Sequence, residues 1–182
     1  GEMVVLRPGE VTFLDATGKE KSFKPTKISW DQKTAQKGGY AHFMIKEIYD
    51  QPQALEDTLR TAQMDFSKIL GMDARSLRAL RNIHIIACGT AYHAGLVGKY
   101  YLEQLAGIPV SVDLASEYKY RTIPSFEHTL AIAISQSGEA ADTIGAIKKA
   151  QKLGFKTLCI CNVLGSTLTR TCDATFFTHC GP

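Results

Sequence analysis

The chain has 182 residues and a formal net charge of +3 at pH 7, the balance of 21 basic and 18 acidic side chains. Hydrophobic residues make up 45% of the sequence and charged residues 21%, which is typical of a folded globular domain and excludes a largely disordered chain. The sequence has no stretch of about 18 apolar residues, so we expect no membrane-spanning segment and no membrane partner. Its basic residues form no cluster, so we expect no nucleic-acid partner either.

The first forty residues differ in pattern from the rest. Residues 3–6, 11–14 and 21–24 predict three short strands joined by turns that contain proline and glycine. So small a meander cannot bury a face of its own, which indicates the end of a domain whose remainder is absent. Residues 25–39 are polar and typical of a linker.

A helical pattern begins at Ala41. The first helix is predicted to end before Pro52, because the residue before a proline disfavours helical geometry. Pro52 suits the first position of a second helix, in which apolar residues recur every three or four positions until Gly71 ends it. The residues of this stripe are Leu55, Leu59, Ala62, Phe66, Ile69 and Leu70.

Strand and helix signals alternate after Arg81. Apolar runs over 83–88, 109–114, 130–135, 157–161 and 174–178 predict five strands, with helices at 90–106 and 139–153 between them. Continuous apolar strands separated by amphipathic helices are typical of a parallel sheet that is covered on both faces. The predicted fold class is therefore α/β, a doubly wound, flavodoxin-like, five-stranded parallel sheet preceded by a short β-rich segment.

The five cysteines indicate reduced thiols in a cytoplasmic protein. Their number is odd, and most lie in the apolar runs. Cys159 and Cys161 are two residues apart, which on a strand points both thiols to one face. The five histidines lack metal-ligand spacing and are expected to be structural, including His84 in a strand, so neither a metal nor a cofactor is predicted. The cysteines are Cys88, Cys159, Cys161, Cys172 and Cys180.

Two loops that follow predicted strands are candidates for ligand binding. In open parallel sheets, ligands bind beyond the carboxyl ends of the strands, where helix N-termini offer unpaired amides. The first loop is Cys88-Gly-Thr-Ala-Tyr92, and the second is Ser135-Gln-Ser-Gly-Glu139. The second offers two hydroxyls, a side-chain amide and a glycine, a combination that suits a phosphate without metal or lysine.

A plainer interpretation of the second loop also stands. Ser, Gln and Gly are ordinary capping residues at a helix start. Glu139 and Asp142 would complement the helix dipole by themselves, and their charge would oppose a phosphate unless both side chains point away. Gly89 begins no G-x-G-x-x-G, so a dinucleotide site is not indicated.

The same loops resemble a known family. The stretches IACGTAYHAG (86–95), LASEY (114–118) and SQSGEAADT (135–143) are similar to the sugar isomerase (SIS) domain. KGGYAHFMIKEIYDQP (37–52) and CNVLGSTLTR (161–170) narrow the resemblance to the glutamine–fructose-6-phosphate aminotransferases. The resemblance covers essentially the whole chain.

This resemblance implies a piece of a longer enzyme, which makes glucosamine 6-phosphate from fructose 6-phosphate and glutamine. Residues 1–36 resemble the end of its glutaminase domain plus a linker, and residues 37–182 its first SIS domain. The catalytic groups of the family belong to parts that this sequence lacks. The chain is therefore expected to hold fructose 6-phosphate or glucosamine 6-phosphate without transforming it, and no catalytic residue is assigned.

Carried over by position, the phosphate-binding residues are Thr90, Ser135, Gln136 and Ser137. Ala91 and Ala140 stand where the family commonly has Ser and Thr, so two hydroxyl donors are missing. The expected partners are the second SIS domain, the glutaminase domain and a second copy of the chain in a homodimer. Two alternatives remain open: a regulatory module that senses phosphosugars, and a dimerisation domain with a vestigial site.

Overall fold

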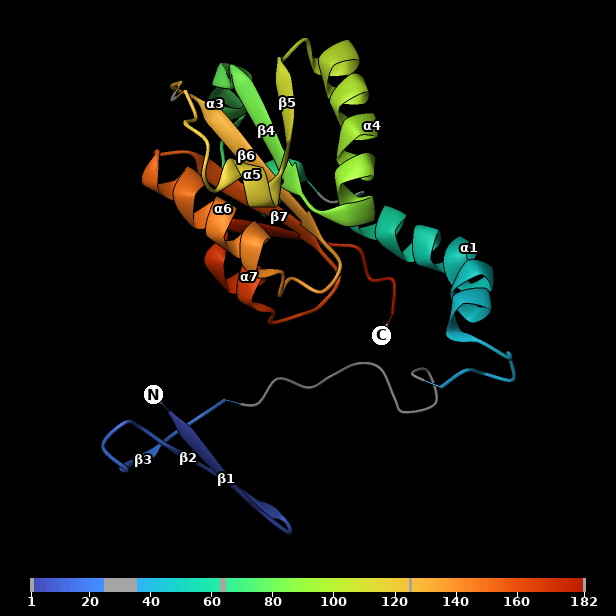
Figure 1. The fold of residues 1–182 in the computed structure, drawn as a ribbon, viewed down its shortest axis with the longest axis vertical. Helices are drawn as coiled ribbons and strands as arrows, with labels where there is room; N and C mark the ends of the chain where they lie inside the picture. Colours follow the sequence, from blue (N-terminus) through green and yellow to red (C-terminus); the bar gives the residue numbers. More distant parts are fainter. Residues whose placement is uncertain (1, 25–35, 63–64, 125, 182) are drawn as a thin grey trace. The chain divides into compact units, whose positions relative to one another are not determined.

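The chain divides into two compact units, residues 1–35 and residues 36–182, which are described separately. The computed structural model is drawn in Figure 1. It describes residues 2–24, 36–62, 65–124 and 126–181.

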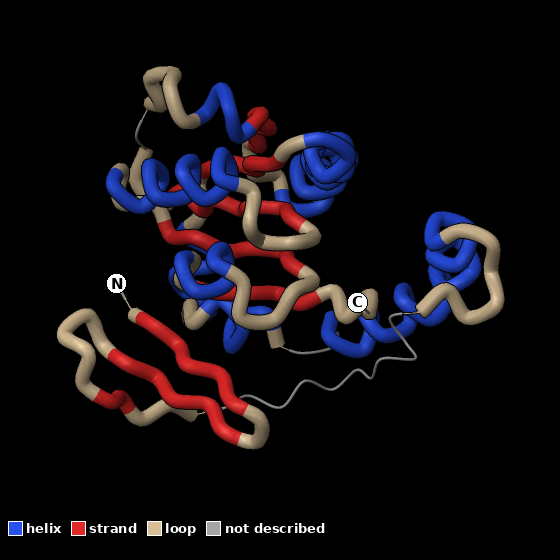
Figure 2. The backbone as a smooth tube through the Cα atoms, turned by 60° about the horizontal axis from the view of Figure 1, so that its bottom comes forward, coloured by secondary structure: helices blue, strands red, loops and turns tan. Residues whose placement is uncertain are grey.

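The larger unit contains the predicted five-stranded parallel sheet, with strands in the order β5-β4-β6-β7-β8. Central strand β4 pairs on both sides, so that Ile85 lies between Val112 of β5 and Ile132 of β6. Figure 2 shows the strands side by side among the helices. The strands are Asn82–Ala87 (β4), Val110–Leu114 (β5), Thr129–Ser135 (β6), Lys156–Cys161 (β7) and Ala174–Phe177 (β8).

Helices cover both faces of the sheet, as the apolar strands predict. Helix α4 lies on one face, and α5, α6 and α7 lie on the other (Figure 1). Crossovers of this kind make the fold doubly wound. The four helices are Gly89–Ala106 (α4), Ala115–Tyr118 (α5), Ala141–Lys152 (α6) and Thr167–Thr171 (α7).

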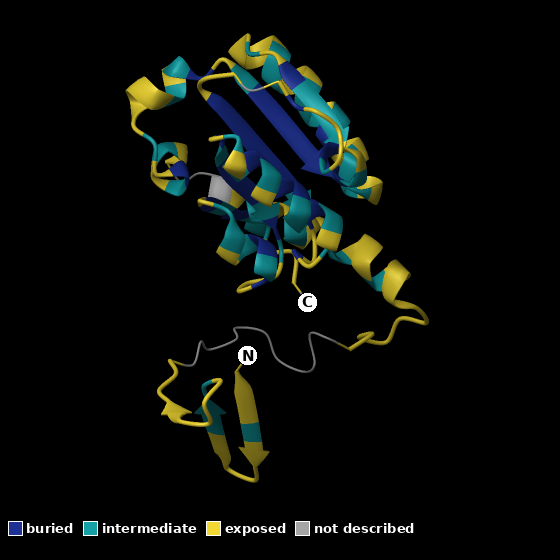
Figure 3. Ribbon diagram, turned by 60° about the vertical axis from the view of Figure 1, so that its left-hand side comes forward, coloured by how far each residue is buried: buried dark blue, intermediate teal, exposed yellow. Residues whose placement is uncertain are grey.

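Alternating strand residues supply two cores, one on each face. Ile83 and Ile85 of β4 belong to the core that contacts Leu102 of α4. Ile86 of the same strand belongs to the other core, with Ile147 of α6. Both Ile86 and Ile147 are fully buried, and each contributes about 1.5–3 kcal/mol by leaving water. Figure 3 shows the buried central strands in dark blue.

The thiols and the strand histidine lie where the sequence predicts. All five cysteines are free. Cys159 and Cys161 are both buried in the same core. His84 is buried in β4, with its ring edge-on to that of Tyr118. Burial lowers the pKa of His84, so it stays neutral and serves packing.

The helical segment before the sheet differs from the prediction. Helix α1, Phe43–Ala62, runs through Pro52 without a break, so the predicted end of a first helix and the predicted start of a second helix at this proline are both wrong. The predicted helix over 52–70 is also not continuous, because α1 ends at Ala62 and another helix begins at Phe66. The helical turns on both sides of the proline outweigh the one backbone hydrogen bond that it removes. Within the predicted apolar stripe, Leu55 and Leu59 are exposed. Residues 63–64 lie outside the described residues.

Residues 66–70 belong to the predicted second helix but form a separate short helix, which ends at Gly71 as predicted. The other short helices, after residue 71 and within the crossovers, went unpredicted, because four to six residues carry too little periodicity. Helix α2, Phe66–Leu70, begins at Asp65, whose carboxylate accepts from the Ser67 N–H. Helix α3, Ala74–Ala79, begins in the same way at Asp73, which accepts from the Ser76 N–H. An aspartate before a short helix is a start signal that the sequence contains, and here it marks the start of both helices.

The smaller unit contains the predicted short strands. Strands β1 (Met3–Arg7), β2 (Glu10–Leu14) and β3 (Glu20–Lys21) pair antiparallel in that order. Leu6 is 75% exposed, and most side chains of β1 and β2 are exposed as well, as the yellow strands in Figure 3 show. The described part of this unit therefore buries little apolar surface. In the described residues of both units, no helix is long and apolar enough to cross a membrane.

We expect removal of residues 1–35 to shift the melting temperature by less than about 4 °C, because about 1 kcal/mol corresponds to roughly 2–4 °C in a chain of this size. Differential scanning calorimetry of the full and shortened chains measures the shift. Ile147→Ala is the control for lost core packing and should cost about 2–5 kcal/mol. A drop on truncation as large as that of the control would contradict the prediction.

Candidate functional site

The candidate site lies where the chain reverses its direction of travel across the sheet. From β4 the chain passes to β5 on one side and then returns to β6 on the other side. Ala87 of β4 pairs with Ile134 of β6, so the loops that follow these two strands start side by side. In open α/β sheets, ligands bind at such a switch point, where the two crossovers cover opposite faces.

The first loop ends β4 and starts α4. Gly89 has φ +58°, a left-handed conformation that suits glycine, so the predicted tight turn is present. Thr90 follows in the first turn of α4 and is exposed, and Ala91 is half-buried. The Thr90 hydroxyl is therefore available at the carboxyl edge of the sheet.

The second loop ends β6 and leads to α6. Ser135 is buried, and its Oγ accepts a hydrogen bond from the Gly138 N–H at 3.0 Å. Ser137 is exposed, and its Oγ accepts from the Glu139 N–H at 3.3 Å. Gln136 is exposed, and its carbonyl accepts from the Asn162 N–H at 3.2 Å. Both serine hydroxyls therefore act as acceptors in these bonds, which do not use their own protons.

The starts of α4 and α6 leave backbone donors open. Helix α6 begins at Ala141, two residues later than predicted, and its N-cap is Ala140, which has no polar side chain. Cys88 is the N-cap of α4. Among the described residues, no side chain caps either helix, whereas Asp65 and Asp73 cap α2 and α3. Uncapped amides and the positive end of the dipole favour an anion.

The plain capping interpretation of Ser137 is therefore wrong for α6. Ser137 lies three residues before the N-cap, and its hydroxyl accepts from the loop amide of Glu139. That bond shapes the loop and leaves the first turn of the helix open. The donors of that turn are backbone groups, which the sequence could not assign before the start of the helix was known.

The two nearby acidic side chains have partners elsewhere. Glu139 Oε1 accepts from the Thr167 N–H at 2.8 Å, at the start of α7. Asp142 Oδ1 lies 3.9 Å from Lys119 Nζ. The Glu139 carboxylate is thus held at the start of α7, and the charge of Asp142 is partly offset by Lys119.

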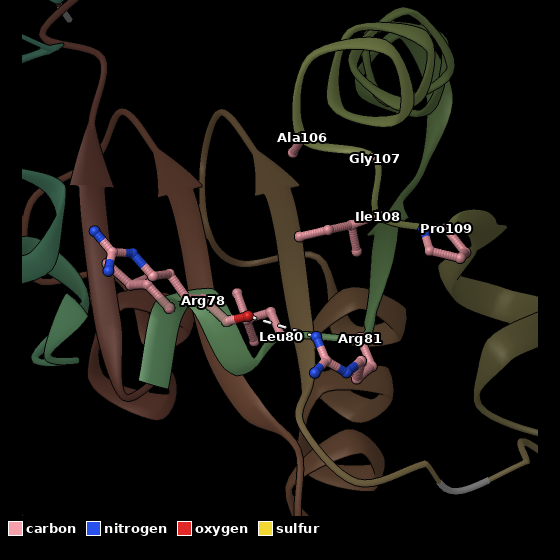
Figure 4. A pocket seen from close by; sticks show the side chains of 8 residues that line it. Arg78, Leu80, Arg81, Ala106, Gly107, Ile108 and Pro109 are labelled. Carbon is pink, nitrogen blue, oxygen red and sulfur yellow. Dashed lines mark hydrogen bonds between the residues drawn. The ribbon is translucent and has the colours of Figure 1, made fainter. Parts of the chain in front are cut away.

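A separate hollow of about 500 Å³ opens at the opposite edge of the sheet. Figure 4 shows it between the residues that precede β4 and those that precede β5, with Arg81 donating to the Arg78 carbonyl. None of the four predicted phosphate-binding residues lines it. Among the described residues, no group of three His, Cys, Asp or Glu side chains could hold a metal ion.

Comparison with known proteins agrees with this geometry. The family model described as the SIS domain matches residues 76–182. The chain belongs to the SIS domain family. Over its whole length this SIS chain is 47% identical to the glutamine–fructose-6-phosphate aminotransferase (isomerizing) of Symbiobacterium thermophilum, and 45% identical to that of Caldanaerobacter subterraneus. It spans 31% and 30% of the length of these two relatives.

A solved structure shows the same fold. The C-terminal domain of glucosamine-fructose-6-phosphate aminotransferase from Francisella tularensis matches with a TM-score of 0.71 and 39% identity. The match covers 81% of this chain and 42% of that one. The predicted family and fold class are thus confirmed.

The SIS domain also contains a close contact that the sequence did not reveal. Gly138 has φ +67°, and a Cβ added there would lie 2.1 Å from Ser166 Oγ and 2.9 Å from Cys161 Sγ. The Leu168 N–H also donates to the Gly138 carbonyl at 2.9 Å. The loop after β6 therefore packs directly on the loop after β7, and this contact requires a glycine.

We expect Gly138→Ala to destabilise the SIS domain by about 2–4 kcal/mol, through backbone strain and overpacking together. Gly154→Ala is the matched control. Gly154 has φ +82° with nothing within 4 Å of an added Cβ, so its cost should be strain alone, about 1–2 kcal/mol. Urea denaturation of both variants measures the difference, and equal costs would contradict the proposed contact.

Proposed function

We propose that this chain is the sugar-phosphate-binding part of an enzyme that converts fructose 6-phosphate and glutamine to glucosamine 6-phosphate and glutamate. The observation that carries the proposal is the pair of uncapped helix starts, α4 and α6, after neighbouring strands at the switch point. Such a pair favours a dianion. The chain is similar to aminotransferases whose names include fructose 6-phosphate, and the phosphate group of this sugar is a dianion.

Four side chains are proposed to bind the phosphate. Ser135 and Ser137 would donate their hydroxyl protons, because their oxygens already accept from loop amides. Thr90 would donate from the first turn of α4, and the exposed Gln136 would donate through its side-chain amide. Hydrogen bonds to a charged group contribute about 1.5–3 kcal/mol each.

Two alanines reduce the donor set. Ala91 is half-buried beside Thr90, and Ala140 is half-buried at the N-cap of α6. Serine and threonine at these positions, as in the family pattern, would add two hydroxyls. The resulting affinity should be weaker than that of a site with six side-chain donors.

We further propose the setting of this domain in a longer protein. Residues 1–36 would be the end of a glutaminase domain plus a linker, and residues 37–182 the first of two SIS domains. The aminotransferases matched by the entire chain are about three times its length, which supports this division. We propose a homodimer in the cytoplasm, where the five free thiols would stay reduced.

The 182 residues by themselves are proposed to bind the sugar phosphate without converting it. The proposed phosphate ligands are neutral hydroxyls and an amide, and isomerisation requires an acid and a base with suitable pKa values. A coupled assay for glucosamine 6-phosphate from glutamine and fructose 6-phosphate should show no product. Product formation would contradict this part of the proposal.

Isothermal titration with fructose 6-phosphate and glucosamine 6-phosphate tests the binding function directly. Inorganic phosphate is the control for the anion alone, and fructose is the control for the sugar alone. We expect both sugar phosphates to bind, and fructose not to bind. No heat from either sugar phosphate would contradict the proposed function and favour a dimerisation domain with a vestigial site.

We expect Ser137→Ala to weaken sugar-phosphate affinity by roughly 10- to 100-fold, because it removes a hydrogen bond worth about 1.5–3 kcal/mol to a charged group. The free energy of unfolding should fall by less than about 1 kcal/mol, since Ser137 does not cap α6. Titration and thermal melts of the same variant separate the two effects. An unchanged affinity together with a lowered melting temperature would contradict the binding role.

We expect Ala140→Thr to tighten binding, because its hydroxyl can donate to a phosphate at the start of α6. The free energy of unfolding should change by less than about 0.7 kcal/mol, the span of helix propensity among ordinary residues. Titration with fructose 6-phosphate compares the variant with the parent chain. Affinity that stays equal would show that this position lies outside the phosphate site.

A further inference from the structure

Glu139 joins the phosphate loop to the loop that follows β7. Its Oε1 accepts from the Thr167 N–H at 2.8 Å, although the two residues are 28 positions apart in the sequence. One residue earlier in each segment, Ser166 packs against Gly138. One residue further along, the Leu168 N–H donates to the Gly138 carbonyl at 2.9 Å. Three neighbouring contacts therefore hold residues 138–139 against residues 166–168.

The same bond determines where the charge of Glu139 lies. Hydrogen bonds from the backbone N–H of Thr167, and then from its side chain, lower the pKa of Glu139, and the charge of Arg170 adds to this effect. The carboxylate is therefore ionised at neutral pH and is held at the start of α7. A carboxylate that turned back toward the open start of α6 would compete with a phosphate for the same amides.

Other contacts of the loop depend on this placement. The Gly138 N–H donates to Ser135 Oγ, and the Glu139 N–H donates to Ser137 Oγ. Both amides belong to the residues that the β7–α7 loop holds. Moving residues 138–139 would therefore remove the hydrogen bond that each serine hydroxyl accepts from the loop.

We propose that Glu139 is a positioning residue for phosphate binding: its bond to Thr167 fixes the loop that presents Ser135 and Ser137, and keeps its own charge away from the phosphate. This inference rests on the function proposed above. Glu139 itself touches no phosphate in this arrangement, and it acts through the serines and the open start of α6.

Two variants of Glu139 separate positioning from simple repulsion. Glu139→Ala removes the charge and the bond, and we expect it to weaken fructose 6-phosphate binding by about tenfold. Glu139→Gln removes the charge but keeps a carbonyl that can accept from the Thr167 N–H, so its affinity should stay within about threefold of the parent chain. If Glu139 merely repelled the ligand, both variants would bind more tightly.

Thr167→Pro removes the donor and leaves Glu139 in place. Proline is tolerated at the first position of a helix, and Ser166 before it has ψ 163°, a conformation that suits a residue preceding proline. We expect a loss of at least tenfold, because the freed carboxylate can then turn toward the phosphate. The Glu139→Ala/Thr167→Pro double variant should lose little more than the worse single variant, since both changes remove the same bond.

Asp142→Asn is the matched control. It removes the other acidic charge in this region, whose neighbour is Lys119 at 3.9 Å, and it leaves the bond between the two loops intact. Its affinity should equal or slightly exceed that of the parent chain. Thermal melts of every variant identify any that fail to fold, in which case Glu139→Gln and Thr167→Pro still provide the test.

The outcomes distinguish the two proposals. If the parent chain binds neither fructose 6-phosphate nor inorganic phosphate, the proposed function fails. If the parent chain binds and Glu139→Ala or Thr167→Pro binds within twofold of it, the positioning role of Glu139 is overturned. Additive losses in the double variant would also overturn it, because they would show that the two residues act independently.

Discussion

The parallel pairing of β4 with β6 is the constraint on which the candidate site depends. Ala87 and Ile134 pair at the carboxyl edge of the sheet, so the two strands end at the same level and their following helices start next to each other. Because α4 and α6 then cover opposite faces, the sheet edge between them stays open. The proposed anion site would therefore use backbone amides at this edge in addition to side chains.

Hydrogen bonds within the second loop hold the two serine side chains that we propose as phosphate ligands. Each serine oxygen accepts from an amide two or three residues further along, and this fixes the hydroxyl while its proton remains free. The absence of a side-chain cap on α6 has the same consequence for the backbone. In α2, by contrast, Asp65 occupies the equivalent position and closes it. The uncapped start of α6 is where we propose that a phosphate oxygen binds.

The two carboxylates near this site, Glu139 and Asp142, contact groups on other elements, Thr167 and Lys119. Acidic residues at the start of α6 favour the helix dipole, yet they would oppose a bound phosphate. Glu139 resolves this conflict by accepting from the first amide of α7, and Asp142 by lying near Lys119. The helix start thus remains positive toward the sheet edge. One carboxylate both orients a loop and removes its own charge from the site.

The five strands, the two long crossover helices and the two candidate loops could be predicted from the sequence, because apolar periodicity and glycine turns are local signals. The continuation of α1 through Pro52, the start of α6 at Ala141 and the bond between Glu139 and Thr167 appear only in the folded chain. Helix limits depend on competing hydrogen bonds that a local pattern does not rank. A contact between residues 28 positions apart depends on which strands lie side by side, and no spacing in the sequence records that order.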